Sequence, residues 1–190
     1  MKLTHLTQAD FQIKPWKNGK GTTADLFMSP AGATHDTFDL RFSMAPIVED
    51  GPFSSFPSAD RRITMIEGNG LDLDFGDFSQ RLVRFEPFGF DTELAPMGSP
   101  VDGPVRVVNV MARRPKWQIA DCNVVDAVSA KLLPGELCFF FAIDAGWQTR
   151  NAETYYTLGK HEVLLAEGAG SLELTSNSSG KGIFAKISPA

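Results

Sequence analysis

Residues 53–75, FSSFPSADRRITMIEGNGLDLDF, form the stretch that decides the fold class. The short apolar run at 63–66 leads into Glu67-Gly68-Asn69-Gly70, a turn in which either glycine can adopt a positive φ. From residue 71 to 75, apolar side chains alternate with aspartates, which is the period of a half-buried strand. The stretch therefore predicts two strands joined by a tight turn.

Short alternating stretches of this kind recur along the chain, separated by Gly, Pro and Asp, and helical periodicity is scarce. In residues 37–45, for example, apolar side chains face one way and polar side chains the other. The pattern predicts an all-β antiparallel sandwich or barrel with few short helices. Further strands are expected at residues 81–86, 105–111, 124–133, 136–143, 161–165, 171–174 and 182–187.

The hairpin sequence IEGNGLDL at residues 66–73 returns as AEGAGSLEL at 166–174, with one residue added after the second glycine. This self-similarity suggests two related β-units in one chain. We expect a first unit at residues 1–120, which holds the ligand pocket, and a second at 121–190, packed on the first as one globular body. The later copy has Lys160-His161 where the first has Arg61-Arg62, so the chemistry is expected in the first unit.

Composition narrows the class of protein. The 190 residues are 22% charged with a net charge of −5, which argues against nucleic acid and anionic membrane surfaces as partners. The N-terminal residues lack the apolar core of a signal peptide, and no apolar run approaches transmembrane length. The two cysteines, Cys122 and Cys138, do not make a disulfide framework. We expect a cytoplasmic protein and leave a homodimer open.

No metal or other cofactor is expected. The three histidines, His5, His35 and His161, stand singly, and the sequence has no H-x-H, H-x-x-E-H or C-x-x-C motif. A G-x-S-x-G nucleophile elbow is also missing, and neither cysteine has a histidine close by in sequence. The sequence therefore predicts no catalytic residue.

Arg61 is the strongest candidate for a ligand-binding residue. Strand parity places it on one face with Ile63 and Met65. If that face looks inward, a permanent cation lies at the rim of an apolar cavity and needs a partner, for which a carboxylate has the best geometry.

Asn109 lies within residues 105–114, VRVVNVMARR, where apolar residues on both faces predict a central strand. Its buried amide must bond either to backbone or to a ligand. Met111 and Arg113 share its face, although an arginine at the end of a strand is more often solvated. Arg41, in the middle of the strand at 37–45, either pairs with an acid or lines the pocket.

The segment Trp16–Thr23 allows two interpretations. It is either a tight glycine-rich turn with Trp16 packed over it, or one wall of a site formed by the indole and backbone N–H groups. It lacks the spacing of a phosphate-binding loop.

Several short motifs follow one another between about residues 14 and 114. They are Trp16-x-Asn18-Gly19-x-Gly21-x-Thr23, Arg41-Phe42-Ser43, Gly51-Pro52-Phe53-Ser54, Phe56-Pro57, Asp60-Arg61, Glu67-Gly68-x-Gly70-Leu71 and Asn109-x-Met111-x-Arg113-Arg114. In this order they resemble the HutD/Ves family. Two positions depart from that pattern: Ser58 stands where the family usually has glycine, and Val107 where it has an acid.

The resemblance implies a fold and a function. The fold would be a bicupin, two fused antiparallel cupin-like β-barrels, without the usual metal-binding histidines. Members of the family are associated with histidine-utilisation operons, where they act as regulators that bind a pathway intermediate. Urocanate is the expected ligand.

The leading hypothesis is therefore a metal-free regulatory protein that binds a small carboxylate such as urocanate. Arg61 would hold the carboxylate and Asn109 would meet a ring nitrogen or the second oxygen. Aromatic and apolar walls would suit a flat conjugated ligand. The complete candidate set is Arg61, Asn109, Trp16, Phe56, Met65, Arg113, Arg41 and Met111.

Two other classes of function stay open. A cupin-fold isomerase or hydrolase acting on a small metabolite would use Glu67, Asp60 or Glu49 as acid and base, which requires two carboxyl groups with separated pKa values. A protein–protein adaptor would explain the apolar segment 139–141, but it would leave Arg61 without a role.

Overall fold

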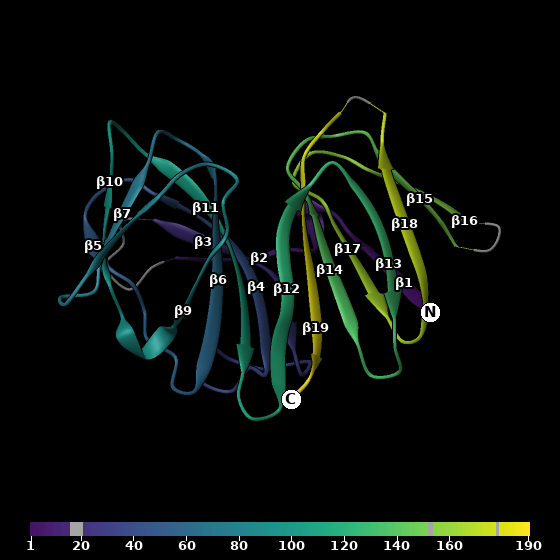
Figure 1. The fold of residues 1–190 in the computed structure, drawn as a ribbon, viewed down its shortest axis with the longest axis horizontal. Helices are drawn as coiled ribbons and strands as arrows, with labels where there is room; N and C mark the ends of the chain where they lie inside the picture. Colours follow the sequence, from purple (N-terminus) through teal and green to yellow (C-terminus); the bar gives the residue numbers. More distant parts are fainter. Residues whose placement is uncertain (16–20, 152–153, 178) are drawn as a thin grey trace. The chain divides into compact units, whose positions relative to one another are not determined.

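The computed structural model describes residues 1–15, 21–151, 154–177 and 179–190. Within these residues the regular structure consists of strands β1 to β19 and two short 3-10 helices, Gln8–Asp10 and Thr92–Leu94 (Figure 1). None of the helices in this described part is long and apolar enough to cross a bilayer. The chain forms two compact units. We call residues 12–118 with Ala190 the Arg61 unit, and residues 1–11 with 119–189 the Trp147 unit.

The Arg61 unit is built from two antiparallel sheets. Its six-stranded sheet has the order β2 (Gln12–Pro15), β3 (Thr22–Ser29), β4 (Leu40–Ile47), β11 (Val105–Arg113), β6 (Ala59–Glu67) and β9 (Phe88–Asp91). Its four-stranded sheet has the order β5 (Gly51–Pro52), β10 (Met97–Pro100), β7 (Leu71–Asp74) and β8 (Ser79–Leu82).

The Trp147 unit also has two sheets. The five-stranded sheet has the order β1 (Lys2–Leu6), β17 (Val163–Glu167), β14 (Leu137–Ala142), β19 (Gly182–Pro189) and β12 (Trp117–Val125). The four-stranded sheet has the order β13 (Ala127–Leu132), β18 (Gly170–Ser176), β15 (Trp147–Asn151) and β16 (Thr154–Leu158).

The N-terminal strand corrects the expected extent of the first unit, residues 1–120. All of β1 pairs with β17, from Lys2 opposite Glu167 to Leu6 opposite Val163. Leu3 packs against the core of the same unit. Residues 1–11 therefore belong to the Trp147 unit rather than to the unit of residues 12–118.

The two units share one topology. The order β4-β11-β6-β9 matches β12-β19-β14-β17, and β5-β10-β7-β8 matches β13-β18-β15-β16, so each of the strands β4 to β11 corresponds to the strand eight numbers later. The predicted pair of related β-units is therefore present. The repeated turn sequence, however, does not lie at equivalent places in the two units. Its first copy joins β6 to β7 and its second joins β17 to β18, whereas the counterpart of β6 is β14. What the turns share is a glycine at positive φ, Gly68 at 104° and Gly168 at 83°.

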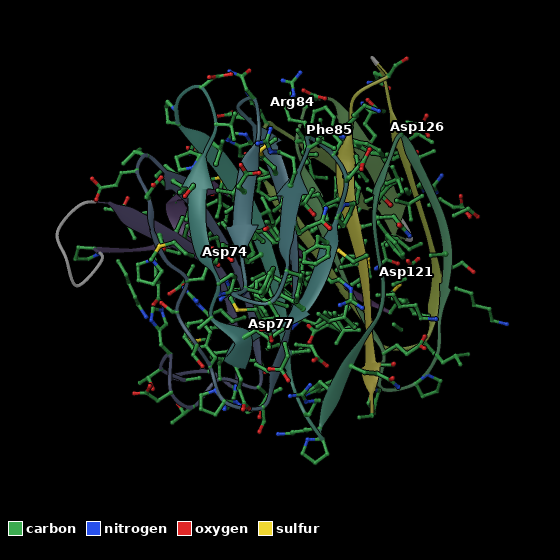
Figure 2. All side chains as sticks on the ribbon, turned by 60° about the vertical axis from the view of Figure 1, so that its left-hand side comes forward. Asp74, Asp77, Arg84, Phe85, Asp121 and Asp126 are labelled. Atoms are coloured by element: carbon green, nitrogen blue, oxygen red, sulfur yellow. The ribbon has the colours of Figure 1, made fainter. Side chains whose placement is uncertain are left out.

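Apolar side chains form the core of each unit, whereas Asp74, Asp77, Asp121 and Asp126, which Figure 2 labels, are exposed. In the Trp147 unit the Phe140 and Trp147 rings lie 4.6 Å apart between centroids, and both are completely buried. Cys138 is part of the same core, and its burial raises the pKa of the thiol.

Candidate functional site

A cavity of about 400 Å³ lies within the Arg61 unit, against one face of the six-stranded sheet. Strand register determines what lines it. Across β4, β11 and β6, Arg41 is opposite Met111, which is opposite Arg61, and in the next inward-facing row Ser43 is opposite Asn109. These five side chains line the cavity. The remaining lining residues come from 14–15, Thr23, His35, Ala45, Ile47, Val107 and the segment 49–56 without Ser55.

Arg61 reaches the cavity because of the alternation along β6. Ala59, Arg61 and Ile63 are buried, while the intervening Asp60 and Arg62 are half-buried. Only 4% of Arg61 is exposed. The two-residue period of the strand therefore predicted the inward orientation of Arg61 correctly, and Arg62 lies on the opposite face of β6.

The surroundings of Arg61 contain no paired carboxylate among the described residues. One terminal nitrogen donates to the Ser54 carbonyl at 3.1 Å, and Nε, although buried, has no hydrogen-bond partner in this part of the chain. The guanidinium carbon lies 5.2, 5.9 and 5.3 Å from the ring centroids of Phe53, Phe56 and Phe90. Burial, and then the charge of Arg41, lower the pKa of Arg61 to about 9. The side chain is a cation at neutral pH.

Arg41 differs from Arg61 because it has a buried acid. Its Nε donates to Asp25 Oδ1 at 2.8 Å, and a terminal nitrogen lies 2.7 Å from the same oxygen. Arg41 and Asp25 are 5% and 4% exposed. The other oxygen of Asp25 lies 3.1 Å from His35 Nε2 and 3.4 Å from Lys14 Nζ. Arg41 thus does both things that were left open: it pairs with an acid and it lines the cavity.

Asn109 lines the cavity beside Met111 and is 7% exposed. Its Oδ1 is buried and accepts no hydrogen bond from the described residues. A buried polar atom without a partner costs about 1–3 kcal/mol. Two residues of the cavity wall thus have a buried polar atom without a partner in the described part of the chain: the donor Arg61 Nε and the acceptor Asn109 Oδ1.

The model of the HutD family matches residues 8–184 of the chain. The chain belongs to the HutD family. It is 31% identical over 173 residues to protein Ves of Escherichia fergusonii, which covers 84% of this chain and 86% of that protein. It is 29% identical over 173 residues to an uncharacterized 21.2 kDa protein in the hutC 3′ region of Pseudomonas putida, which covers 90% of each.

Solved structures agree with this assignment. HutD from Pseudomonas fluorescens SBW25 is 25% identical to this chain, with a TM-score of 0.84 over 100% of both chains. More distant matches share the fold alone: protein Ylba of E. coli, at 8% identity, has a TM-score of 0.69 over 97% of this chain and 90% of that chain, and an oxalate decarboxylase of Bacillus subtilis, also at 8%, has 0.58 over 96% and 76%. The predicted family and the all-β bicupin fold are both confirmed.

The predicted site residues of this HutD-family chain divide into three groups. Arg61, Asn109, Arg41, Met111 and Phe56 all line the cavity. Two others, Met65 and Arg113, do not. Trp16 lies outside the described residues.

Met65 and Arg113 are excluded from the cavity lining by their packing. Met65 is fully buried in the core cluster with Leu71 and Leu73, where the two sheets close on each other. Arg113 lies at the end of β11 and donates to three backbone carbonyls, those of Phe38 at 2.7 Å, Pro57 at 2.7 Å and Asp36 at 3.2 Å. It holds two loops of the Arg61 unit together, which is a structural role.

The acids proposed for an enzyme are mostly paired elsewhere. Arg106 donates to Glu67 at 2.8 Å and Arg114 donates to Asp60 at 2.7 Å, and neither acid lines the cavity. Glu49 is at the exposed rim of the cavity. Among the described residues, no three His, Cys, Asp or Glu side chains are grouped in a way that could hold a metal ion.

Asp25, which pairs with the cavity-lining Arg41, is the residue that sequence reasoning missed. It lies on β3, a strand that the sequence pattern did not predict. A weak signal was available, because an aspartate flanked by apolar residues in a β-rich chain needs a cationic partner, and Arg41 stands mid-strand nearby in sequence.

Proposed function

We propose that this HutD-family protein binds a small carboxylate with a flat conjugated body, urocanate or a related intermediate, and regulates histidine utilisation through that binding. The observation that carries the proposal is that two residues lining one cavity, Arg61 and Asn109, each have a buried polar atom without a partner among the described residues. A ligand carboxylate would accept from Arg61, and a ligand N–H would donate to Asn109.

The rest of the cavity suits such a ligand. Its volume of about 400 Å³ lies in the range of small-molecule sites. Phe53 and Phe56 line it and provide flat apolar surface. The Pseudomonas putida relative is a protein in the hutC 3′ region, and this location supports the connection with histidine utilisation.

A purely structural role for Arg61 is the main competing explanation. In that case its guanidinium only anchors the segment with Ser54, Phe53 and Phe56, and the cavity has another occupant or none. The two explanations differ in what the substitution of Arg61 does to ligand binding.

Calorimetric titration with urocanate separates them. Arg61→Ala should weaken binding by about 2–4 kcal/mol, roughly 30- to 1,000-fold, since a charge-assisted and often bidentate bond is lost. Arg61→Lys should recover only part of the affinity because an ammonium cannot reproduce the planar fork. Arg62→Ala is the matched control on the opposite face of β6 and should bind like the native protein.

Three outcomes would argue against the proposal. Equal affinity of Arg61→Ala and the native protein would place the carboxylate elsewhere. Absence of saturable binding to the native protein would remove urocanate as a ligand. Consumption of urocanate, followed through loss of its ultraviolet absorbance, would favour a cupin-fold isomerase or hydrolase, with Glu49 as the first acid to test.

A further inference from the structure

The buried charges around the cavity have a definite sum. Among the described residues of the Arg61 unit, the charged side chains that are nine-tenths or more buried are two arginines and one acid: Arg61, Arg41 and Asp25, at 4%, 5% and 4% exposure. Their formal charges add to +1. Asp25 neutralises Arg41 through two contacts to one oxygen, at 2.8 and 2.7 Å, whereas Arg61 has no acid among the described residues. One buried positive charge is therefore left without a counter-charge.

The described part of the rim carries charges of both signs. Lys14 and His35, with side chains 37% and 39% exposed, lie on the side of Asp25 and contact its second oxygen. The exposed carboxylates Glu49 and Asp50 line the cavity as well. Charges at the rim are screened by solvent, so the buried sum dominates what the cavity accepts.

A ligand with one carboxylate would bring the buried charge to zero. A second carboxylate on the same ligand has no cation to itself among the described residues, because Lys14 and His35, which also line the cavity, both contact Asp25. At the rim it would face Glu49 and Asp50. At Arg41 it would compete with Asp25, which is buried and cannot be displaced into water. An uncompensated buried carboxylate costs several kcal/mol.

From this balance we infer that the cavity selects singly charged carboxylates over dicarboxylates, and that Asp25 is the residue that determines this selectivity. The inference rests on the proposed carboxylate site at Arg61 and adds a charge class to its ligand. Asp25 acts through Arg41: by holding that guanidinium, it leaves Arg61 as the sole buried cation in the described part of the cavity able to take a carboxylate.

The test uses two probes that differ in one group. Sorbate and trans,trans-muconate have the same six-carbon diene skeleton, and the methyl end of sorbate is a second carboxylate in muconate. Competition against urocanate measures both affinities on the native protein. Muconate should bind at least about tenfold more weakly than sorbate.

A variant tests the role of Asp25. Asp25→Asn keeps an oxygen for Arg41 but removes the negative charge, so the buried sum rises from +1 to +2. Muconate affinity should then increase at least about tenfold relative to the native protein, while sorbate affinity stays within a few-fold. Asp77→Asn is the control, because Asp77 is an exposed carboxylate of the same unit that does not line the cavity, and its loss should leave the sorbate-to-muconate ratio unchanged. Circular dichroism verifies that each variant folds.

The affinities of the two probes separate the charge selectivity from the carboxylate site itself. Muconate binding as well as sorbate to the native protein would overturn the selectivity while leaving the carboxylate site intact. Neither probe nor urocanate binding would remove the proposed function and this inference together. If Asp25→Asn folds and muconate affinity does not rise, Asp25 is not the determinant; if it does not fold, the comparison of the two probes on the native protein still tests the selectivity.

Discussion

Arg61→Met should leave the empty protein as stable as the native one, or slightly more stable. A pKa lowered from its ordinary value to about 9 corresponds to roughly 5 kcal/mol of penalty on the charged form. Three aromatic contacts at about 1 kcal/mol each and one hydrogen bond of about 2 kcal/mol offset most of it. Methionine keeps the apolar stem and removes the charge, so the free energy of unfolding should change by less than about 1 kcal/mol.

Arg41→Met is the matched control, because the two arginines flank Met111 in one row of the sheet. Removing Arg41 leaves Asp25 buried, with the half-exposed Lys14 and His35 as its remaining cationic neighbours among the described residues. Loss of one partner of a buried ion pair costs about 3–5 kcal/mol, and these two neighbours should reduce the cost to about 2–4 kcal/mol.

Urea unfolding, with the midpoint compared at constant m-value, measures both effects. The same experiment with saturating urocanate should stabilise the native protein and not Arg61→Met. A loss of 3 kcal/mol or more in Arg61→Met without ligand would refute the reasoning, since it would mean that the cation itself is required by the fold. Equal losses in both variants would show that the absence of an acid at Arg61 has no energetic consequence.

Three further predictions concern the same cavity. Asn109→Ala should weaken urocanate about tenfold and leave trans-cinnamate, which lacks a ring N–H, unchanged in calorimetric competition; equal losses would assign Asn109 to the carboxylate instead. Because the lowered pKa of Arg61 is about 9, half of its side chains are neutral at pH 9, and a bound carboxylate favours the cation. Binding at pH 9 should therefore take up about half a proton and binding at pH 7 none, with affinity falling as the pH rises above 9. Titrations in buffers of different ionisation enthalpy measure this uptake, and its absence at pH 9 would show that the empty cavity keeps Arg61 fully charged. Treatment with a chelator should leave both the melting temperature and urocanate affinity unaltered, and a fall restored by one particular metal would contradict the metal-free assignment.

Local pattern was sufficient for the parts of the site that lie within one strand. The alternation along β6 placed Arg61 inward, and the apolar residues on both faces of β11 placed Asn109 in a central, buried strand. Both inferences depend only on the two-residue period of a strand.

What sequence could not supply was the pairing between strands. Asp25 meets Arg41 because β3 pairs with β4, and the register of that pair shifts between Asp25 and Phe27. An irregularity of this kind breaks the alternation by which β3 would have been recognised. Met65 shows a second limit. It shares a face of β6 with Arg61, but it packs in the core with Leu71 and Leu73. The pattern of a single strand does not indicate where the cavity ends and the core begins.

The repeated topology has a consequence for how a binding site can arise in this fold. Two units with the same strand order differ in what fills them: β14 supplies Phe140 where its counterpart β6 supplies Arg61 and Ile63, and Phe140 packs on Trp147. The backbone framework alone therefore does not decide whether a barrel is hollow. Side-chain volume also decides how much room is left inside, so a chamber can be enlarged or filled by substitutions that leave the strands in place.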